Sequence, residues 1–445
     1  MKFEKLSYPE DWGLFSLQEV CSRITSGGTP SRKNEDFYKN GSVCWVKTKE
    51  LENYYIYDTE EKITSDAIKN SSAKILPQNT ILLAMYGATV GELGILSKDM
   101  ACNQACCALI VNSDQFDYRY VFYLLKLHKK EIQSLATGAA QQNLSATVIR
   151  DFTFGFPILE KQKNIANILE CLDKKIQLNT QTNQTLEAIA QAIFKSWFVD
   201  FDPVRAKAAA LNEGKSEHEA NLAAMSVICG KDTSELSDTE CSTLWQIAEA
   251  FPSEFVENEE FGEVPKGWEV KKVGEIANFI KGKKPKQISN FQENEMLPHI
   301  LVASLSGKYS EFAPTEKAVI CQNTETLILM DGSGSGKISI GHNGVVGSTL
   351  AKLNLNNEKY WAIIHLLLKN KELDIQQHTT GTSIPHTDKT RVLNYNLIIP
   401  CDIILNWFNG YLENTLHSIL TNRNKNLSLE KIRDELLPKL LSGEI

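Results

Sequence analysis

One stretch of the chain has the composition of a phosphate-binding loop. Residues 331–339 read Asp-Gly-Ser-Gly-Ser-Gly-Lys-Ile-Ser. Such a loop needs Gly-x4-Gly-Lys-Ser/Thr, because backbone N–H groups and the lysine hold the phosphates and the hydroxyl holds Mg²⁺. Here Asp331 stands in place of the first glycine and Ile338 in place of the hydroxyl. We interpret the stretch as a flexible turn between strands that lets backbone approach something closely, with a nucleotide-hydrolysing enzyme as an alternative.

Other catalytic or metal-binding patterns are missing from the sequence. No Gly-x-Gly-x-x-Gly opens a strand-turn-helix, and the eight histidines are scattered singly. The ten cysteines lack zinc spacing, since Cys102, Cys106 and Cys107 have no CxxC or histidine partner nearby. Nothing assembles a nucleophile with a base. The sequence therefore predicts a chain without catalysis, metal or cofactor.

Hydrogen-bonding and basic side chains gather in loops at matched places in two halves of the chain. Residues 26–33 correspond to 281–286, and residues 137–143 to 380–386. Lysine and arginine neutralise phosphates, whereas glutamine, asparagine, arginine and serine read base edges. Ordinary solvated loops are the alternative. The DNA-binding candidates are Thr29, Ser31, Arg32, Lys33, Lys47, Tyr86, Gln104, Gln141, Gln142, Asn143, Lys281, Lys283, Lys284, Lys286, Ser333, Lys337, Thr382 and His386.

These loops recur because the chain contains an internal repeat. Adding 243 to a residue number maps 138–198 onto 381–441 without a gap. Upstream the offset changes to 245 and then to 256, so the second copy is shorter in its loops. A repeat has to be found first, because it decides the fold. The sequence predicts two versions of one unit, each a globular domain followed by a long helix.

The long helices carry a heptad seam with two asparagines in each copy. Apolar residues step by alternating fours and threes, as in helices that pack on each other, and a buried asparagine fixes register. Two amphipathic helices lying on separate cores are the alternative. The predicted seam is Leu172, Ile176, Asn179, Asn183, Leu186, Ile193, Ile419, Asn422, Asn426, Leu429 and Leu436.

Short β-like runs separated by Gly, Asn and Pro predict an α+β fold. The main helices of the two domains are expected at 118–136 and 359–373, and both domains end in a strand that stops at a proline. We expect two pseudo-repeated α/β domains separated by two long helices packed as an antiparallel coiled coil. The predicted boundaries are 1–157, domain 1; 158–205, central helix; 206–264, acidic linker; 265–400, domain 2; and 401–445, C-terminal helix.

The net charge of −8 seems unfavourable for nucleic acid, but it is unevenly placed. Segment 206–264 holds 13 acidic and 3 basic residues, whereas 265–400 holds 16 basic and 12 acidic. We expect a partly ordered linker in the acidic segment, with 206–211 and 241–250 as candidate short helices, and no repulsion of phosphate by either domain. No apolar run is long enough to span a membrane and no signal peptide opens the chain, so we expect a cytoplasmic protein.

Several long stretches resemble the specificity subunits of type I restriction-modification systems. They are residues 185–205, which include Ser-Trp-Phe-Val-Asp-Phe-Asp-Pro-Val-Arg, then 262–270, which read Gly-Glu-Val-Pro-Lys-Gly-Trp-Glu-Val, and 437–445 at the C-terminus. Residues 157–162, Pro-Ile-Leu-Glu-Lys-Gln, resemble the family's entry to its central helix. The second copy departs from this pattern at 400–404, where the Glu and Gln are missing.

The resemblance implies two target-recognition domains, each reading half of a bipartite double-stranded DNA site, with the paired helices setting the gap. It implies two modification (methyltransferase) subunits and restriction (translocase/nuclease) subunits as partners. S-adenosylmethionine, ATP and Mg²⁺ would be on those partners, with none in this chain. A non-catalytic coiled-coil adaptor without DNA specificity is the alternative.

Overall fold

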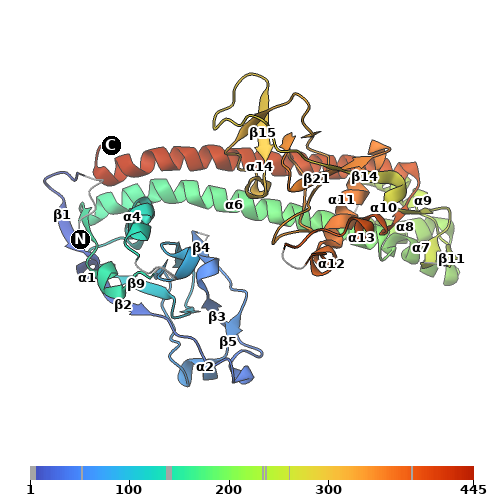
Figure 1. Cartoon of the computed structure of the whole chain (residues 1–445). Helices are drawn as coiled ribbons and strands as arrows, with labels where there is room; N and C mark the ends of the chain where they lie inside the picture. Colours follow the sequence, from blue (N-terminus) through green and yellow to red (C-terminus); the bar gives the residue numbers. More distant parts are fainter. Residues whose placement is uncertain are drawn as a thin grey trace. The chain divides into compact units, whose positions relative to one another are not determined.

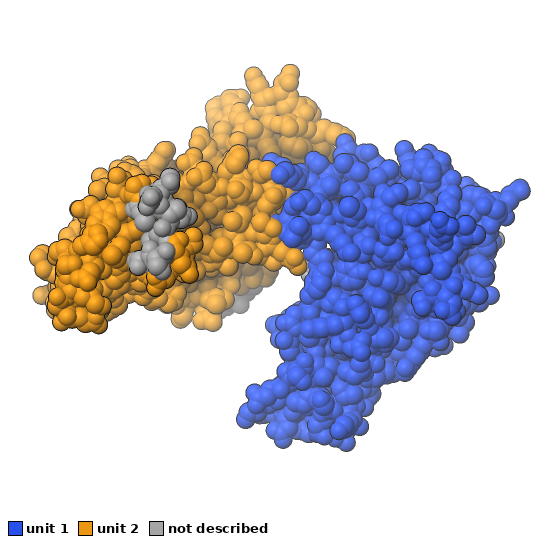
Figure 2. All heavy atoms as spheres, turned by 180° about the vertical axis from the view of Figure 1, so that it is seen from behind, with its two compact units in different colours: residues 1–180, 424–445 blue, residues 181–423 orange. Residues whose placement is uncertain are grey.

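The computed structural model describes residues 7–51, 54–136, 143–232, 235, 238–259, 261–381 and 384–445. The chain divides into two compact units: unit 1 holds residues 1–180 and 424–445, and unit 2 holds residues 181–423. Figure 2 shows unit 1 in blue and unit 2 in orange. Each unit contains one globular domain and part of both long helices, so we describe each separately.

Unit 1 is built on two sheets. The larger has the order β2-β9-β6-β7-β4 and the smaller β5-β3-β8, while β1 pairs with β10 as a separate ribbon. The strands are β1 (Gly13–Ser16), β2 (Cys21–Ser26), β3 (Val43–Val46), β4 (Tyr55–Ile56), β5 (Lys62–Ile63), β6 (Ile81–Ala84), β7 (Leu93–Leu96), β8 (Ala101–Cys102), β9 (Cys106–Val111) and β10 (Thr153–Phe156). The helices are α1 (Leu17–Val20), α2 (Ser65–Lys69), α3 (Tyr118–Leu127), α4 (Lys129–Ser134) and α5 (Ala146–Arg150).

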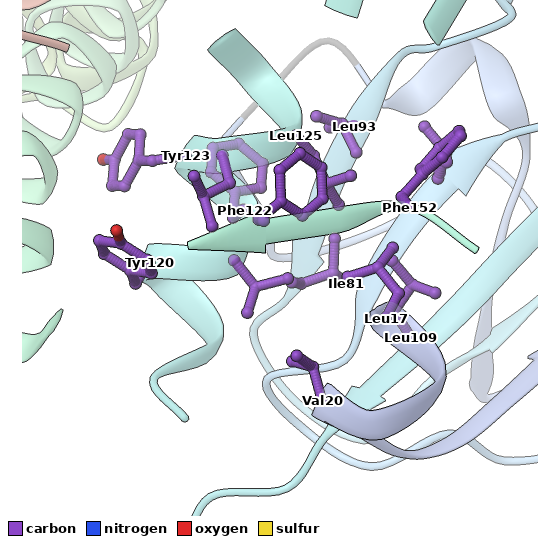
Figure 3. Packing of buried hydrophobic residues seen from close by; sticks show 14 of the residues in the cluster. Leu17, Val20, Ile81, Leu93, Leu109, Tyr120, Phe122, Tyr123, Leu125 and Phe152 are labelled. Carbon is purple, nitrogen blue, oxygen red and sulfur yellow. The ribbon is translucent and has the colours of Figure 1, made fainter. Parts of the chain in front are cut away.

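The core of unit 1 lies around α3. Six successive residues of this helix, 120–125, are buried, because α3 is covered both by the large sheet and by the long helices. Figure 3 shows Phe122 and Leu125 among Ile81, Leu109 and Phe152. The single helix predicted over 118–136 is instead α3 followed by α4, with a break at His128.

Unit 2 repeats this architecture. Its strand order β14-β21-β18-β19 corresponds to β2-β9-β6-β7, and its parallel pair β15–β20 corresponds to β3–β8. The strands are β11 (Phe255–Asn258), β12 (Gly262–Pro265), β13 (Glu269–Lys272), β14 (Ala277–Lys281), β15 (Met296–Ile300), β16 (Phe312–Pro314), β17 (Ile320–Cys321), β18 (Leu327–Leu329), β19 (Ile338–Ser339), β20 (Gly344–Val346), β21 (Leu350–Leu355) and β22 (Asn396–Ile399). The domain helices are α10 (Val273–Ile276), α11 (Trp361–Asn370), α12 (Glu372–Gln377) and α13 (Lys389–Leu393). The predicted duplication of an α+β domain is thus confirmed.

The two long helices are α6 (Leu159–Phe198) and α14 (Asp402–Ser442), drawn in green and red in Figure 1. They are antiparallel in both units. In unit 1 the Asn179 amide donates to the Asn426 side-chain oxygen at 2.8 Å, and in unit 2 the Asn422 amide donates to that of Asn183 at 2.9 Å. The predicted coiled-coil packing is confirmed, and every predicted seam residue is at least half-buried, whereas Leu178 on the opposite side is exposed.

Gln162 fastens the start of α6 to the domain of unit 1. Its side chain accepts a hydrogen bond from the backbone N–H of Asp117 at 3.0 Å and donates to the carbonyl oxygen of Pro157 at 2.8 Å. The equivalent residue in α14 is Leu405, which is fully buried in the apolar core of unit 2. The departure of the second copy from the Glu-Gln pattern therefore exchanges a polar contact for an apolar one.

Segment 206–264 forms helices over both predicted stretches, 206–211 and 241–250, but it is more fully folded than the partly ordered linker that its acidity predicts. It is largely folded as α7 (Asp202–Asn212), α8 (Glu217–Cys229), α9 (Asp238–Ala250) and the β11–β12 hairpin. Its apolar residues Ile247 and Phe251 enter the core of unit 2. The ammonium group of Lys207 donates to the carbonyl oxygens of Ala248 and Phe251 at 3.0 and 2.6 Å. Those carbonyls close a helix end, where a cation is favourable.

Candidate nucleic-acid interface

Two loops of unit 1 lie at one end of its large sheet, together with the last residue of a third. The first loop, 27–34, follows β2; the second, 86–92, follows β6; and the third precedes α5 and is described from Asn143 onward. The backbone N–H groups of Gly27 and Met85 donate to the carbonyls of Cys106 and Ala105, at 3.2 and 2.8 Å. Leu144 N–H then donates to Met85 at 2.9 Å. Main-chain bonds therefore bring the first two loops and the described end of the third, at Asn143 and Leu144, to the same end of the sheet.

Unit 2 brings its loops together by the same bonds. Its first loop is 282–295, its second 331–337 and its third 380–386. The N–H groups of Gly282 and Met330 donate to Leu350 and Thr349 at 2.9 and 2.8 Å, and that of Thr387 donates to Met330 at 2.8 Å. An isolated β-bridge joins the second and third loops in each unit, Tyr86 to Asn143 and Asp331 to His386.

The first glycine of each first loop is required by close approach of the backbone. A Cβ added to Gly27 would lie 2.2 Å from the carbonyl oxygen of Cys102. One added to Gly282 would lie 2.3 Å from that of Gly347. Both distances are shorter than any allowed contact, so only glycine lets the loop leave the sheet here.

Asp331 is neutralised at the centre of the loops in unit 2. Lys281 Nζ lies 2.8 Å from one carboxylate oxygen and His386 Nδ1 lies 2.8 Å from the other. Partial burial acts to raise the pKa of Asp331, but the hydrogen bonds from Lys281 and His386 outweigh it and hold this pKa below its ordinary value. The carboxylate therefore does not oppose an incoming phosphate as an isolated charge would.

The glycine-serine stretch of the second loop is a turn between the antiparallel strands β18 and β19. The Ser335 hydroxyl contacts the carbonyl oxygens of Gly332 and Pro385, at 2.7 and 2.8 Å. A phosphate-binding loop leads instead into a helix N-terminus. The turn assignment is confirmed, and Ser333 and Lys337 are exposed on it.

The other basic candidates fall into two groups. Lys33, Lys283, Lys284 and Lys286 are exposed, and within the described part of the chain no carboxylate pairs with them. By contrast, Lys47 lies on the smaller sheet and its ammonium is 3.2 Å from Glu61 and 3.5 Å from Glu60. Its charge is therefore already compensated.

Two polar candidates of unit 1, Thr29 and Ser31, lie on the first loop. The hydroxyl of Thr29 donates to the side-chain oxygen of Gln104, which fixes the first loop against the turn before β9. Ser31 is exposed, and its carbonyl accepts from Asn34 N–H at 3.2 Å. Gln141, Gln142 and Thr382 lie outside the described residues.

Arg32 has partners that the sequence does not reveal. Its Nη2 donates to a carboxylate oxygen of Glu61 at 2.6 Å, and its guanidinium carbon lies 4.3 Å from the Tyr38 ring centroid and 5.3 Å from that of Trp45. Hydrogen bonding from Arg32 lowers the pKa of Glu61. Residues 32 and 61 lie on different elements, so no spacing rule could have paired them.

Two buried histidines of unit 2 contact hydroxyl groups. His342 lies between Tyr309 and Ser339, at 2.9 and 2.7 Å, and His365 contacts Thr326 at 3.2 Å. Among the residues that the structure describes, no three His, Cys, Asp or Glu side chains cluster as metal ligands. None of the described helices is both long and apolar enough to cross a membrane.

These features define a class of protein in which two copies of one α+β domain present loops of different sequence on a frame of paired helices. The chain belongs to the family described as the type I restriction modification DNA specificity domain, whose sequence pattern matches residues 9–188 and 265–402. The resemblance noted in the sequence is thereby confirmed.

Individual proteins agree with this membership. The chain is 28% identical to the specificity subunit of the type I restriction enzyme MjaIX of Methanocaldococcus jannaschii, over 98% of this chain and 94% of that protein. It is 29% identical to the HindI specificity subunit of Haemophilus influenzae, over 98% of this chain and all of that protein. The crystal structure of a type I restriction-modification S subunit from M. genitalium has the same fold, with a TM-score of 0.53 at 16% identity and 98% coverage of both chains.

Proposed function

We propose that this chain is the DNA-reading subunit of a type I restriction-modification complex, in which each domain reads one half of a bipartite duplex site. The observation that carries the proposal is the shared anchoring of the loops. The same three backbone hydrogen bonds, at the start of the first loop, before the second and after the third, recur in both units, while the loop sequences differ. Two scaffolds of one kind with different loops suit two half-sites of different sequence.

The long helices set the unread gap between the half-sites in this proposal. The proposed partners are two modification subunits, which bind S-adenosylmethionine and transfer the methyl group, and restriction subunits, which use ATP and Mg²⁺. The chain itself is proposed to catalyse nothing and to hold no cofactor, and it would act where chromosomal DNA is accessible, in the cytoplasm. The pure chain is accordingly expected to show neither methyl transfer nor nucleotide hydrolysis.

Mapping methylated adenines in a genome that carries the chain and its modification partner tests the proposal. We expect one bipartite motif with an unread gap of fixed length. Exchanging the third loop, 137–143, for that of a related protein should change one half of the motif and leave the other half and the gap intact. A change in both halves, or the absence of a bipartite motif in the wild type, would refute the proposal.

Direct measurement of DNA binding distinguishes the proposed function from the alternative, a coiled-coil adaptor without DNA specificity. The complex of the chain with its modification subunits would then retain equal affinity for duplexes with and without the mapped motif. We expect instead a preference for the motif and a steep fall of affinity with salt, because phosphate contacts release counterions.

A further inference from the structure

Arg32 is the most firmly positioned cation on the first loop of unit 1. Glu61 accepts from one of its terminal nitrogens at 2.6 Å, and its guanidinium group lies over the rings of Tyr38 and Trp45. Within the described part of the chain, Glu61 is the one acceptor bonded to this guanidinium. The side chain is still 55% exposed, so its remaining N–H groups are open to solvent.

The loop and both rings are themselves fixed. The Tyr38 hydroxyl donates to the carbonyl oxygen of Pro30 at 2.6 Å, and the Trp45 indole N–H donates to that of Gly28 at 3.0 Å. Trp45 is almost wholly buried, and Gly28 N–H donates to Cys102 at 2.9 Å. A side chain held on a rigid support is what a binding site needs for precise geometry, since little conformational entropy is then lost on binding.

Stability does not explain this arrangement. An ion pair with 55% and 33% of its two side chains exposed contributes only about 0–1 kcal/mol. The first loop of unit 2 carries no arginine at all between 282 and 295. The arrangement is therefore specific to the domain of unit 1 and is not part of the shared scaffold.

We propose that Arg32 reads a guanine in the DNA half-site of unit 1, with Glu61 as its positioning residue. This rests on the proposed function. A guanidinium with two free N–H groups matches the adjacent O6 and N7 acceptors of guanine in the major groove. Adenine places an amino donor where guanine has O6, cytosine presents a donor, and thymine presents a single acceptor beside a methyl group. The two parallel N–H donors of the Arg32 guanidinium therefore select guanine.

The conservative variant Arg32→Lys separates base reading from phosphate binding, because lysine keeps the positive charge but lacks the two parallel N–H donors of arginine. Methylated adenines are mapped in cells that carry the full chain with its modification subunit. We expect one guanine in one half of the motif to become degenerate, with discrimination at that position falling about 5- to 150-fold, equivalent to 1–3 kcal/mol for a bidentate contact. The other half and the gap stay unchanged. Glu61→Gln should relax the same position less, and Lys215→Ala, an exposed lysine outside the loops, should relax none.

A second measurement uses the unaltered complex, so that folding of a variant does not matter. Duplexes in which each guanine of that half-site is replaced in turn by 7-deazaguanine lack one acceptor in the groove. One of these duplexes should bind about tenfold more weakly, and the Arg32→Lys complex should bind it as it binds the natural duplex. An intact motif, or a uniform loss of affinity at all positions, would show that Arg32 contacts phosphate or nothing and would overturn the assignment. Absence of any bipartite motif in the wild type would instead overturn the proposed function.

Discussion

The side-chain amide of Asn179 donates to the side-chain oxygen of Asn426 across 2.8 Å, inside the helix pair of unit 1. Asn179 is almost fully buried, and the Asn426 amide also bonds to the Ile176 carbonyl and the Thr180 hydroxyl, at 3.3 and 3.2 Å. The pair is therefore a small polar network in an otherwise apolar seam. Such a network fixes the register of two helices and lowers their stability relative to an apolar seam.

Asn179→Ala should destabilise the chain by about 1–2 kcal/mol, because it leaves the buried oxygen of Asn426 without its donor. Replacing both residues by leucine should be close to neutral or stabilising, since both polar groups are then removed. Urea denaturation measures both free energies of unfolding. Asn424→Ala, on an exposed position of α14, is the control and should change little. Equal destabilisation in the single and double variants would contradict the network.

Asp173 should matter more to stability than any exposed carboxylate. It is buried and accepts hydrogen bonds from the Tyr123 hydroxyl at 2.9 Å, Lys126 at 3.0 Å and Arg433 at 2.6 Å. Asp173→Asn removes the buried counter-charge of Lys126 and leaves Arg433 with the exposed Asp434 alone, which should lower the free energy of unfolding by about 3 kcal/mol.

The control for that variant is Asp434→Asn. Asp434 binds the same arginine, at 2.7 Å, but 63% of its side chain is exposed. Its loss should change the free energy of unfolding by less than about 1 kcal/mol. If the two variants proved equally stable in urea, burial would not be what makes the Asp173 pair important.

Acidification should weaken unit 2 through His365. Burial, assisted by Lys369 nearby, lowers the pKa of this histidine to about 3. Below pH 6.5 the unfolded chain binds a proton that the folded ring does not, so stability falls with pH and keeps falling until about pH 3. One such group removes roughly 2 kcal/mol between pH 6.5 and pH 5.

His365→Asn should reduce by one the number of protons that the chain takes up on unfolding below pH 6.5. The free energy of unfolding of unit 2, measured between pH 5 and pH 8, should then fall less steeply in the variant than in the wild type below pH 6.5. The comparison at pH 8, where the wild-type ring is neutral in both the folded and the unfolded chain, gives the cost of the substitution itself. Parallel curves for the two proteins over the whole range would show that His365 does not contribute.

The lysines of the first loop in unit 2 should bind phosphate without reading sequence. Replacing Lys283, Lys284 and Lys286 by alanine should weaken binding to all duplexes alike and reduce the slope of log K against log salt by about 0.9 for each phosphate that is no longer neutralised. Lys215→Ala, an exposed lysine outside the loops, is the control. A change of the methylated motif in the triple variant would assign these lysines to base reading.

The sequence was sufficient to predict the duplicated domains and paired helices, because a long repeat and a heptad seam are periodic signals. It did not show which asparagines pair. The repeat aligns Asn179 with Asn422, whereas the antiparallel helices bring Asn179 to Asn426 and Asn183 to Asn422. Pairing depends on the register of the two antiparallel helices, which a repeat offset does not contain.

Two other features depend on contacts between distant residues. The acidity of 206–264 concealed Ile247 and Phe251, which enter the core of unit 2. Composition averages over a segment, whereas folding is decided by the few apolar residues that find a core. The Arg32–Glu61 pair is likewise invisible in the sequence, since it depends on how the first loop lies on the smaller sheet.

The loops of both units are tied to their sheets through main-chain N–H and carbonyl groups. Every residue except proline offers the same two groups, so these ties survive nearly any substitution of the side chains between them. Mutations in the loops are then nearly neutral for folding. Under the proposed function, each domain can therefore change its half-site without a compensating change in the other domain. In the first loop of each unit, one residue of this anchoring must stay glycine, Gly27 or Gly282.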